Sequence, residues 1–363
     1  MVGGKRATQQ RSMASGNDTR SSGARKAETA RKLRDALSAR DAGARRAPAK
    51  ETVATFLDSR LEGTRSSLRP RTFVSYSQIV RDHVKPTLGR IPLARLQPQQ
   101  VQQLYAQLLS GGRAKKTVRN VHVTLHRALA QAQRWRLVPT NVADLIDPPR
   151  VPPAEIKVLT PEQARKVLEV SRGDDLEALW TVALTAGLRQ GELLSLRWPE
   201  LDLDRGSLRV VASLIRIVGN EPLLVEPKSR HSRRQVDLSS GAVDALRRHR
   251  TNAIESALAA GRAYDRNGFV FRRPDGRPLS VTSTWKQWRR LLRAAEVPAM
   301  SFHSARHTAA TLLLCANVHV KIVSEMLGHS SVSFTLDRYS HFIPTIQREA
   351  ARVMDELLAT QLI

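Results

Sequence analysis

The chain has 363 residues, enough for two domains, and carries 59 Lys and Arg against 33 Asp and Glu, a formal net charge of +26. This excess of positive charge indicates a polyanionic partner, with nucleic acid as the leading candidate. No apolar run approaches the roughly 18 to 20 residues of a membrane span, no apolar signal-peptide core follows Met1, and one cysteine, Cys315, excludes an intramolecular disulfide. We therefore expect a cytoplasmic protein in which Cys315 is a small buried hydrophobe.

The first 50 residues form a basic extension. They hold 13 Lys and Arg, four Asp and Glu, and no aromatic residue. Such a segment buries too little apolar area to offset its ordering entropy, which predicts that 1–50 is largely disordered alone. Within it, 27–39 has apolar residues at helical spacing and could form a helix on a partner or on DNA. A solubilising tail is the alternative interpretation.

Residues 51–146 have a helical pattern throughout. The apolar spacing predicts a small four-helix bundle, with one basic surface on its last helix. That surface begins with Lys115, Lys116 and Arg119, which we expect to bind DNA, although a merely solvated face is the alternative for each cation. The expected helices are 53–61, 70–80, a helix following Pro98, and 114–135.

A proline-rich run at 147–154 predicts an extended linker, because proline lacks an amide donor and has a fixed φ. The second domain, 155–345, begins with a helix signal in which Thr160 is the N-cap and Gln163 completes a capping box. A helix at 175–186 is expected to end at Gly187.

The second domain then changes to a strand-like period. Residues 208–217, 222–226 and 233–238 predict one three-stranded antiparallel sheet. The fold class is therefore mainly α with a small antiparallel β-sheet. Further helices are expected at 241–260, 281–295, 304–316, 319–328 and 331–339.

Several residues of this domain suit phosphoryl chemistry, which needs cations, a nucleophile and a proton donor. Arg189 lies just after Gly187, between two helices. In the run HSARH, His303 and Arg306 have i, i+3 spacing and can face one anion. His307 is four residues after His303, which is also a metal-ligand spacing, but the intervening arginine disfavours a bound dication.

Two more candidates follow. His329 comes after Gly328 in LGHSS, and Tyr339 is ten residues further on in DRYSH, on a short helix that Ser330 or Ser331 can cap. Taken alone, a tyrosine or a histidine is usually a packing residue. Their position close behind HSARH favours the chemical interpretation.

In this order, Arg189 followed by Gly-Glu, then HSARH, then LGH, then Arg-Tyr, the motifs resemble the signature of the tyrosine recombinase, or phage integrase, family across about 155–345. The resemblance implies a mixed α/β catalytic domain of the DNA breaking-rejoining type. It also implies a lysine on a hairpin of the small sheet, which Lys228 fits as the only lysine between Lys166 and Lys286. One departure is Ser304-Ala305, where the family commonly has Asp-Leu.

The resemblance implies roles for these residues. Arg189 and Arg306 would hold the non-bridging phosphate oxygens, Tyr339 would attack phosphorus, and His303 would act as general base. Lys228 would protonate the leaving 5′ oxygen and His329 would donate a hydrogen bond to the phosphate. Glu192 and His307 would have supporting roles. No metal ion, ATP or other cofactor is implied, since the phosphoester is kept in a 3′-phosphotyrosyl linkage.

The resemblance also implies partners and domain roles. The partner would be double-stranded DNA bearing recombination sites, bound by a homo-tetramer, with accessory bending or directionality factors. Residues 51–146 would be the SAM-like core-binding domain, and 1–50 a remnant of an arm-binding region. The tail 346–363 would dock on a neighbouring protomer or pack on its own domain.

Three functions remain open at this stage. Integration or excision of a phage or mobile element is preferred because of the basic extension. A relaxing enzyme of the type IB topoisomerase kind would share the chemistry, and a non-enzymatic DNA-binding protein would suit the charge alone.

Overall fold

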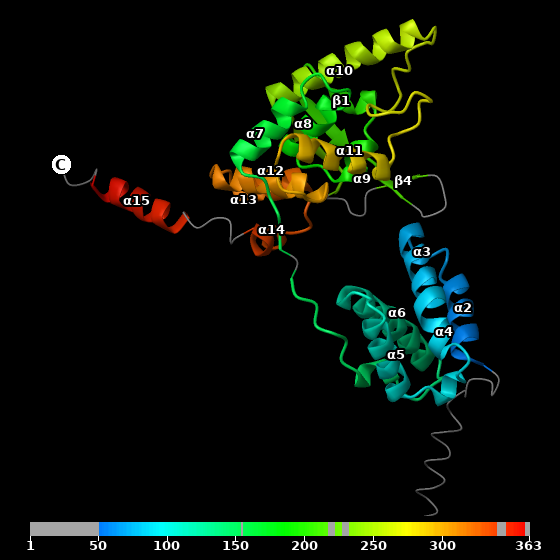
Figure 1. Cartoon of the computed structure of the whole chain (residues 1–363). Coiled ribbons are helices and arrows are strands. Elements are labelled where there is room, and N and C mark those ends of the chain that lie inside the picture. Colours follow the sequence, from blue (N-terminus) through cyan, green and yellow to red (C-terminus); the bar gives the residue numbers. More distant parts are fainter. Residues whose placement is uncertain (1–50, 154, 217–221, 227–231, 340–345, 360–363) are drawn as a thin grey trace, which may run out of the picture. The chain divides into compact units, whose positions relative to one another are not determined.

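The computed structural model describes residues 51–153, 155–216, 222–226, 232–339 and 346–359, and the chain divides between Pro152 and Pro153 into two compact units (Figure 1). Each unit is described by itself. The helix expected at 27–39 lies outside the described residues.

The first unit is helical, as the apolar spacing predicts. All four expected helices are present, and each begins at a local signal: Thr52 forms a capping box with Thr55, and Pro70 and Pro98 occupy first-turn positions. The second runs on past Val80 through a π-helical turn, so its predicted end was too early. The elements are α2 (Val53–Gly63), α3 (Pro70–Ile79), the π-helical turn Val80–Val84, α4 (Lys85–Leu88), α5 (Pro98–Ser110) and α6 (Lys115–Arg134).

One long helix, α6, gives this unit both its core and a basic face. Val121 and Leu125 of α6 are fully buried in one apolar cluster with Leu104 of α5. On the opposite face, the first turns of α6 expose Lys115, Lys116 and Arg119. The helix is therefore strongly amphipathic, with cations where apolar side chains are absent.

The second unit is also mainly helical. Thr160 and Gln163 form the expected capping box, and all of the expected helices are present, whereas the short α9 was not predicted. Trp180, Trp288 and Phe302 pack together in the core, with ring centroids 5.6–6.0 Å apart. The helices are α7 (Pro161–Val170), α8 (Glu177–Thr185), α9 (Gln190–Leu194), α10 (Ser240–Ala259), α11 (Val281–Ala294), α12 (His303–Cys315), α13 (Val320–Leu327), α14 (Val332–Tyr339) and α15 (Ile346–Ala359).

The strands form two sheets, so the prediction of one three-stranded sheet was wrong. The order β1-β2-β5 makes one antiparallel sheet, and β3 pairs with β4 in another. The chain leaves β2 near Ala212, whose carbonyl oxygen accepts a hydrogen bond from Ser195 Oγ (2.9 Å). The strands are β1 (Leu201–Asp202), β2 (Ser207–Val210), β3 (Ser213–Ile215), β4 (Leu223–Val225) and β5 (Arg234–Asp237).

Because the chain leaves the first sheet after β2, β3 lies against α9. A Cβ atom at Gly191 would lie 2.4 Å from the carbonyl oxygen of Leu214, so only glycine allows this approach. The predicted strand 208–217 therefore contains parts of two strands, with Val210 at the end of β2 and Ser213 at the start of β3. Its uniform β-propensity gives no sign of the change from one sheet to the other.

Cys315 is exposed, so the expectation that it is buried was wrong. It is the last residue of α12, and the buried position of that turn is Leu314. One residue further on, a helical side chain points about 100° away, which follows from 3.6 residues per turn. Cys315 therefore faces solvent.

Gly187 ends α8 as expected, with φ +60°. A Cβ there would lie 2.8 Å from Leu327 Cδ2. We expect Gly187→Ala to lower the free energy of unfolding by about 2 to 3 kcal/mol, from left-handed strain plus this clash. Gly173→Ala is the matched control, because Gly173 has φ +77° with no atom within 4 Å of an added Cβ. Equal losses in urea denaturation would contradict the clash.

Candidate active site

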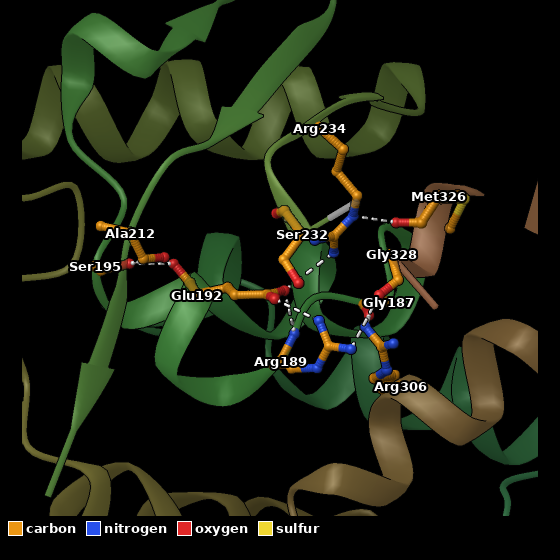
Figure 2. Close-up of polar contacts among 10 residues, drawn as sticks. All are labelled: Gly187, Arg189, Glu192, Ser195, Ala212, Ser232, Arg234, Arg306, Met326 and Gly328. Atoms are coloured by element: carbon orange, nitrogen blue, oxygen red, sulfur yellow. Dashed lines mark hydrogen bonds and ion pairs between the residues drawn. The ribbon is translucent and has the colours of Figure 1, made fainter. Parts of the chain in front are cut away.

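Arg189 is held at two points beside Gly187. Its backbone N and Nη1 donate hydrogen bonds to the two carboxylate oxygens of Glu192 (3.0 and 2.6 Å), and Nη2 donates to the carbonyl oxygen of Gly328 (3.1 Å), as Figure 2 shows. The side chain is nevertheless 38% exposed. The guanidinium group is thus fixed in place while part of it remains open to an anion.

Arg306 lies in the first turns of α12 and is buried. Its Nη1 donates a hydrogen bond to the carbonyl oxygen of Gly187 (2.9 Å), two residues before Arg189. Burial and the nearby charge of Arg189 lower the pKa of Arg306 to about 9. The negative charge of a bound anion would oppose both effects by stabilising the charged guanidinium group, so the two arginines together favour binding of a phosphate.

Glu192 joins Arg189 to a third cation that the sequence analysis missed, Arg234. Arg234 Nη2 donates a hydrogen bond to Glu192 Oε2 (3.0 Å). Burial of the carboxyl group raises its pKa, but Arg234 and Arg189 outweigh this effect and the pKa of Glu192 lies below its ordinary value. The glutamate is therefore ionised and orients its neighbours. A period-two pattern could have indicated Arg234, since it shares a strand face with the buried Val236.

Tyr339 is buried, and its hydroxyl group contacts a histidine. Tyr339 Oη lies 2.7 Å from His307 Nδ1. Burial raises the pKa of Tyr339, which Arg306 and Arg338 oppose only partly. The phenol is thus protonated at neutral pH, and an attack by its oxygen needs a proton acceptor.

His303 and His307 form a pair on α12, with ring centroids 4.6 Å apart. His307 is buried, and burial and then His303 lower its pKa to about 4. Desolvation by neighbouring atoms and then Arg306 lower the pKa of His303 to about 4 as well, although part of this side chain is exposed. Both rings are therefore neutral at pH 7 and able to accept a proton.

His329 follows Gly328, which has φ +67° at the end of α13. His329 Nδ1 lies 2.8 Å from the hydroxyl oxygen of the fully buried Thr335, so Nε2 is the nitrogen left for a ligand. Burial, followed by Arg306 and Arg189, lowers the pKa of His329 to about 3. Ser331 Oγ accepts from the Phe334 amide (3.3 Å), so Ser331 caps the helix that carries Tyr339.

Four expected site residues remain. Lys228 lies outside the described residues. Lys115, Lys116 and Arg119 belong to the first unit. Among the described side chains, no group of three or more His, Cys, Asp or Glu is arranged to hold a metal ion. Over the same ranges, no helix combines the length and the apolar character needed to cross a bilayer.

The depressed pKa of His307 predicts a pH dependence of stability. As pH falls, the unfolded chain binds this proton first, near the ordinary pKa of 6.5, so the contribution is full above that pH and is lost on the way down to about 4. Between pH 7 and pH 5 we expect a loss of about 2 kcal/mol from His307 alone. The variant His307→Gln keeps His303 and His329. Over this pH range its free energy of unfolding should fall by about 2 kcal/mol less than that of the unaltered protein, which urea unfolding at the two pH values measures. Equal losses in both proteins would contradict the shift.

Two protein-family models match this chain, one in each unit. The model of the "Phage integrase family" matches residues 157–344, and that of the "Phage integrase, N-terminal SAM-like domain" matches 52–109. A "Tyrosine recombinase XerC-like" protein of Caldanaerobacter subterraneus subsp. tengcongensis is 32% identical over 311 residues, which cover 81% of this chain and 80% of that protein.

Solved structures are similar in fold. The Tn1549 transposon integrase in complex with a circular intermediate DNA has a TM-score of 0.71 and 22% identity, over 83% of this chain and 99% of that one. A lambda integrase tetramer bound to a Holliday junction has a TM-score of 0.57 and 16% identity, over 78% and 79% of the two chains.

Proposed function

Because the chain belongs to the phage integrase family of tyrosine recombinases, it is a DNA strand transferase for site-specific recombination of mobile elements, and we propose that Tyr339 is its nucleophile. The observation that supports this role best is the 2.7 Å contact between Tyr339 Oη and His307 Nδ1. The next residue before His307 is Arg306, so one turn of α12 carries both a proton acceptor and a cation.

The reaction proceeds by in-line attack. The phenolic oxygen forms a bond to phosphorus, the bond from phosphorus to the 5′ oxygen breaks, and the phenolic proton passes to an imidazole. The contact with Tyr339 supports His307 as that acceptor, while His303, given this role in the sequence analysis, remains a candidate because its ring packs against His307. Lys228 protonates the leaving 5′ oxygen.

Charge stabilisation comes from the arginines. Arg189 and Arg306 bind the non-bridging oxygens and offset the charge that develops in the transition state. His329 Nε2, the nitrogen directed away from Thr335, donates the further hydrogen bond to the phosphate. The phosphoester is kept in a 3′-phosphotyrosyl linkage, so rejoining requires no external energy source.

The assembly follows from the need to join two duplexes. Residues 155–345 form the catalytic domain and 51–146 the core-binding domain, whose Lys115, Lys116 and Arg119 contact the DNA backbone. The protein works as a homo-tetramer on double-stranded DNA near the nucleoid, a proposal that the lambda integrase tetramer on a Holliday junction supports. The tail 346–363 docks on a neighbouring protomer, which suits the exposed Val353, Met354 and Leu357 of α15. Accessory factors set the direction.

The experiment selects covalent protein-DNA adducts, under denaturing conditions, from a pool of nicked duplexes with a randomised recognition segment. After cleavage, the nick lets the short fragment that bears the free 5′ hydroxyl group diffuse away. Rejoining is then impossible, so the adduct accumulates. Enrichment of a defined sequence over successive rounds is the expected result. Adducts without sequence preference, together with relaxation of any supercoiled plasmid, would favour the topoisomerase alternative. Binding without any adduct would favour a non-enzymatic DNA-binding protein.

A further inference from the structure

We propose that Arg234 is a positioning residue for strand transfer, which holds Glu192 and the end of α13 so that Arg189 and His329 are placed at the scissile phosphate and Arg189 keeps its positive charge for it. The inference rests on the proposed roles of Arg189 and His329. It concerns a residue that lies beside the reacting groups and acts through them.

The Arg234 guanidinium group joins three segments of the chain. Nη2 donates to Glu192 Oε2 on α9 (3.0 Å), Nε donates to the carbonyl oxygen of Met326 on α13 (2.6 Å), and Nη1 donates to that of Ser232 (3.3 Å), all visible in Figure 2. The side chain is only 7% exposed, against 38% for Arg189. Arg234 therefore has little surface with which to contact DNA, and its effect must be indirect.

Its contact with α13 fixes the turn before His329. The carbonyl group of Met326 is among the last of α13, which lack partners within the helix, and a cation is favourable at this end of a helix. A Cβ at Gly328 would lie 2.9 Å from Arg234 Nη1, so the guanidinium group packs directly on this glycine. The carbonyl oxygen of Gly328 is also the acceptor for Arg189 Nη2. One turn thus connects Arg234 with both Arg189 and His329.

Its contact with Glu192 adjusts the charge available at Arg189. The Glu192 carboxylate is buried and is shared between Arg189 and Arg234. If Arg234 were neutral, the whole negative charge of Glu192 would offset Arg189 alone. Less positive charge would then remain for a phosphate whose negative charge increases in the transition state. Arg234 therefore contributes both geometry and charge to the site.

The test uses single-turnover cleavage of the selected nicked duplex at saturating protein. We expect Arg234→Met to cleave about 100-fold more slowly while its Kd for DNA changes less than about threefold. Arg234→Lys restores the charge but cannot make all three hydrogen bonds of the guanidinium group. It should therefore cleave about tenfold faster than Arg234→Met. Arg209→Met is the matched control: Arg209 is exposed on the neighbouring strand β2, and its loss should leave the rate unchanged.

A second DNA separates this role from a purely structural one. A methylphosphonate at the scissile position replaces a charged oxygen with a methyl group, so the reaction needs less positive charge. On this DNA, Arg234→Met should cleave about tenfold more slowly than the unaltered protein, because the part of the loss that comes from charge disappears while the part that comes from geometry remains.

Two results would overturn the proposal: a rate for Arg234→Met within about threefold of the unaltered protein on ordinary DNA, or an equal loss on both DNAs. If Arg234→Met fails to fold, the neutral and polar variant Arg234→Gln is compared on the two DNAs by the same criterion. If the unaltered protein forms no adduct at all, the proposed function itself fails, and this inference fails with it.

Discussion

Replacing Tyr339 by Phe is expected to abolish the covalent adduct on nicked DNA, with a loss of at least about 10⁴-fold, because no other group supplies the attacking oxygen. The phenylalanine ring keeps the packing of Tyr339 against Ala310, Leu314, Val323 and Leu327. The hydrogen bond to His307 is lost, at a cost of about 1 kcal/mol in the free energy of unfolding. Non-covalent DNA binding should therefore be retained. Denaturing gels measure the adduct, and mobility shifts under native conditions measure binding.

Tyr264→Phe is the matched control. Tyr264 belongs to the same unit but lies under the guanidinium group of Arg272, outside the cluster around Arg189. It should form adducts at the rate of the unaltered protein. If Tyr339→Phe formed adducts as fast as this control, Tyr339 could not be the nucleophile.

Replacing Arg306 by Gln is expected to slow cleavage by about 10³-fold or more, which corresponds to about 4 kcal/mol of transition-state stabilisation. Glutamine keeps an amide donor near the carbonyl oxygen of Gly187 but removes the charge. Affinity for DNA should fall less than about tenfold, since the chain carries 59 Lys and Arg that can share the contacts with the DNA backbone. Single-turnover rates at saturating protein separate the two effects.

Arg338→Gln removes the same charge from an exposed position on α14, beside Tyr339. Its rate should fall less than about tenfold, because a solvated charge is screened. Equal losses in the two variants would mean that Arg306 acts only through the general field of the protein, which would contradict direct contact with the phosphate.

Much of the helical architecture could be predicted from the sequence because its signals are local. Thr160 with Gln163 marks a helix start, and Gly187 marks an end, whatever the rest of the chain does. The recombinase motifs also occur in order along the chain, so the fold and the family could be inferred before any contact was known.

The rest depends on contacts between distant residues. The change of sheet after Val210 follows from the contact of Ala212 with Ser195, and Arg234 meets Met326, which is 92 residues later in the chain. No local pattern encodes such pairs. Cys315 is exposed because it comes one residue after the buried Leu314 on α12. Both lie in one apolar stretch of sequence, which does not indicate which of the two is buried.

The hydrogen-bond partner of the Tyr339 hydroxyl group could not be predicted from the sequence either. In the run HSARH, His303 and His307 lie one turn apart on the same face of α12. Spacing alone therefore cannot say which of them Tyr339 contacts, and packing of α14 against α13 and α12 brings His307 to it.

The most direct measurement is mass spectrometry of the trapped adduct after nuclease and protease digestion. The account predicts a peptide in which Tyr339 carries a nucleotide through its 3′ phosphate, and no such peptide from Tyr339→Phe. A nucleotide attached to any other side chain, or attached through a 5′ phosphate, would contradict it.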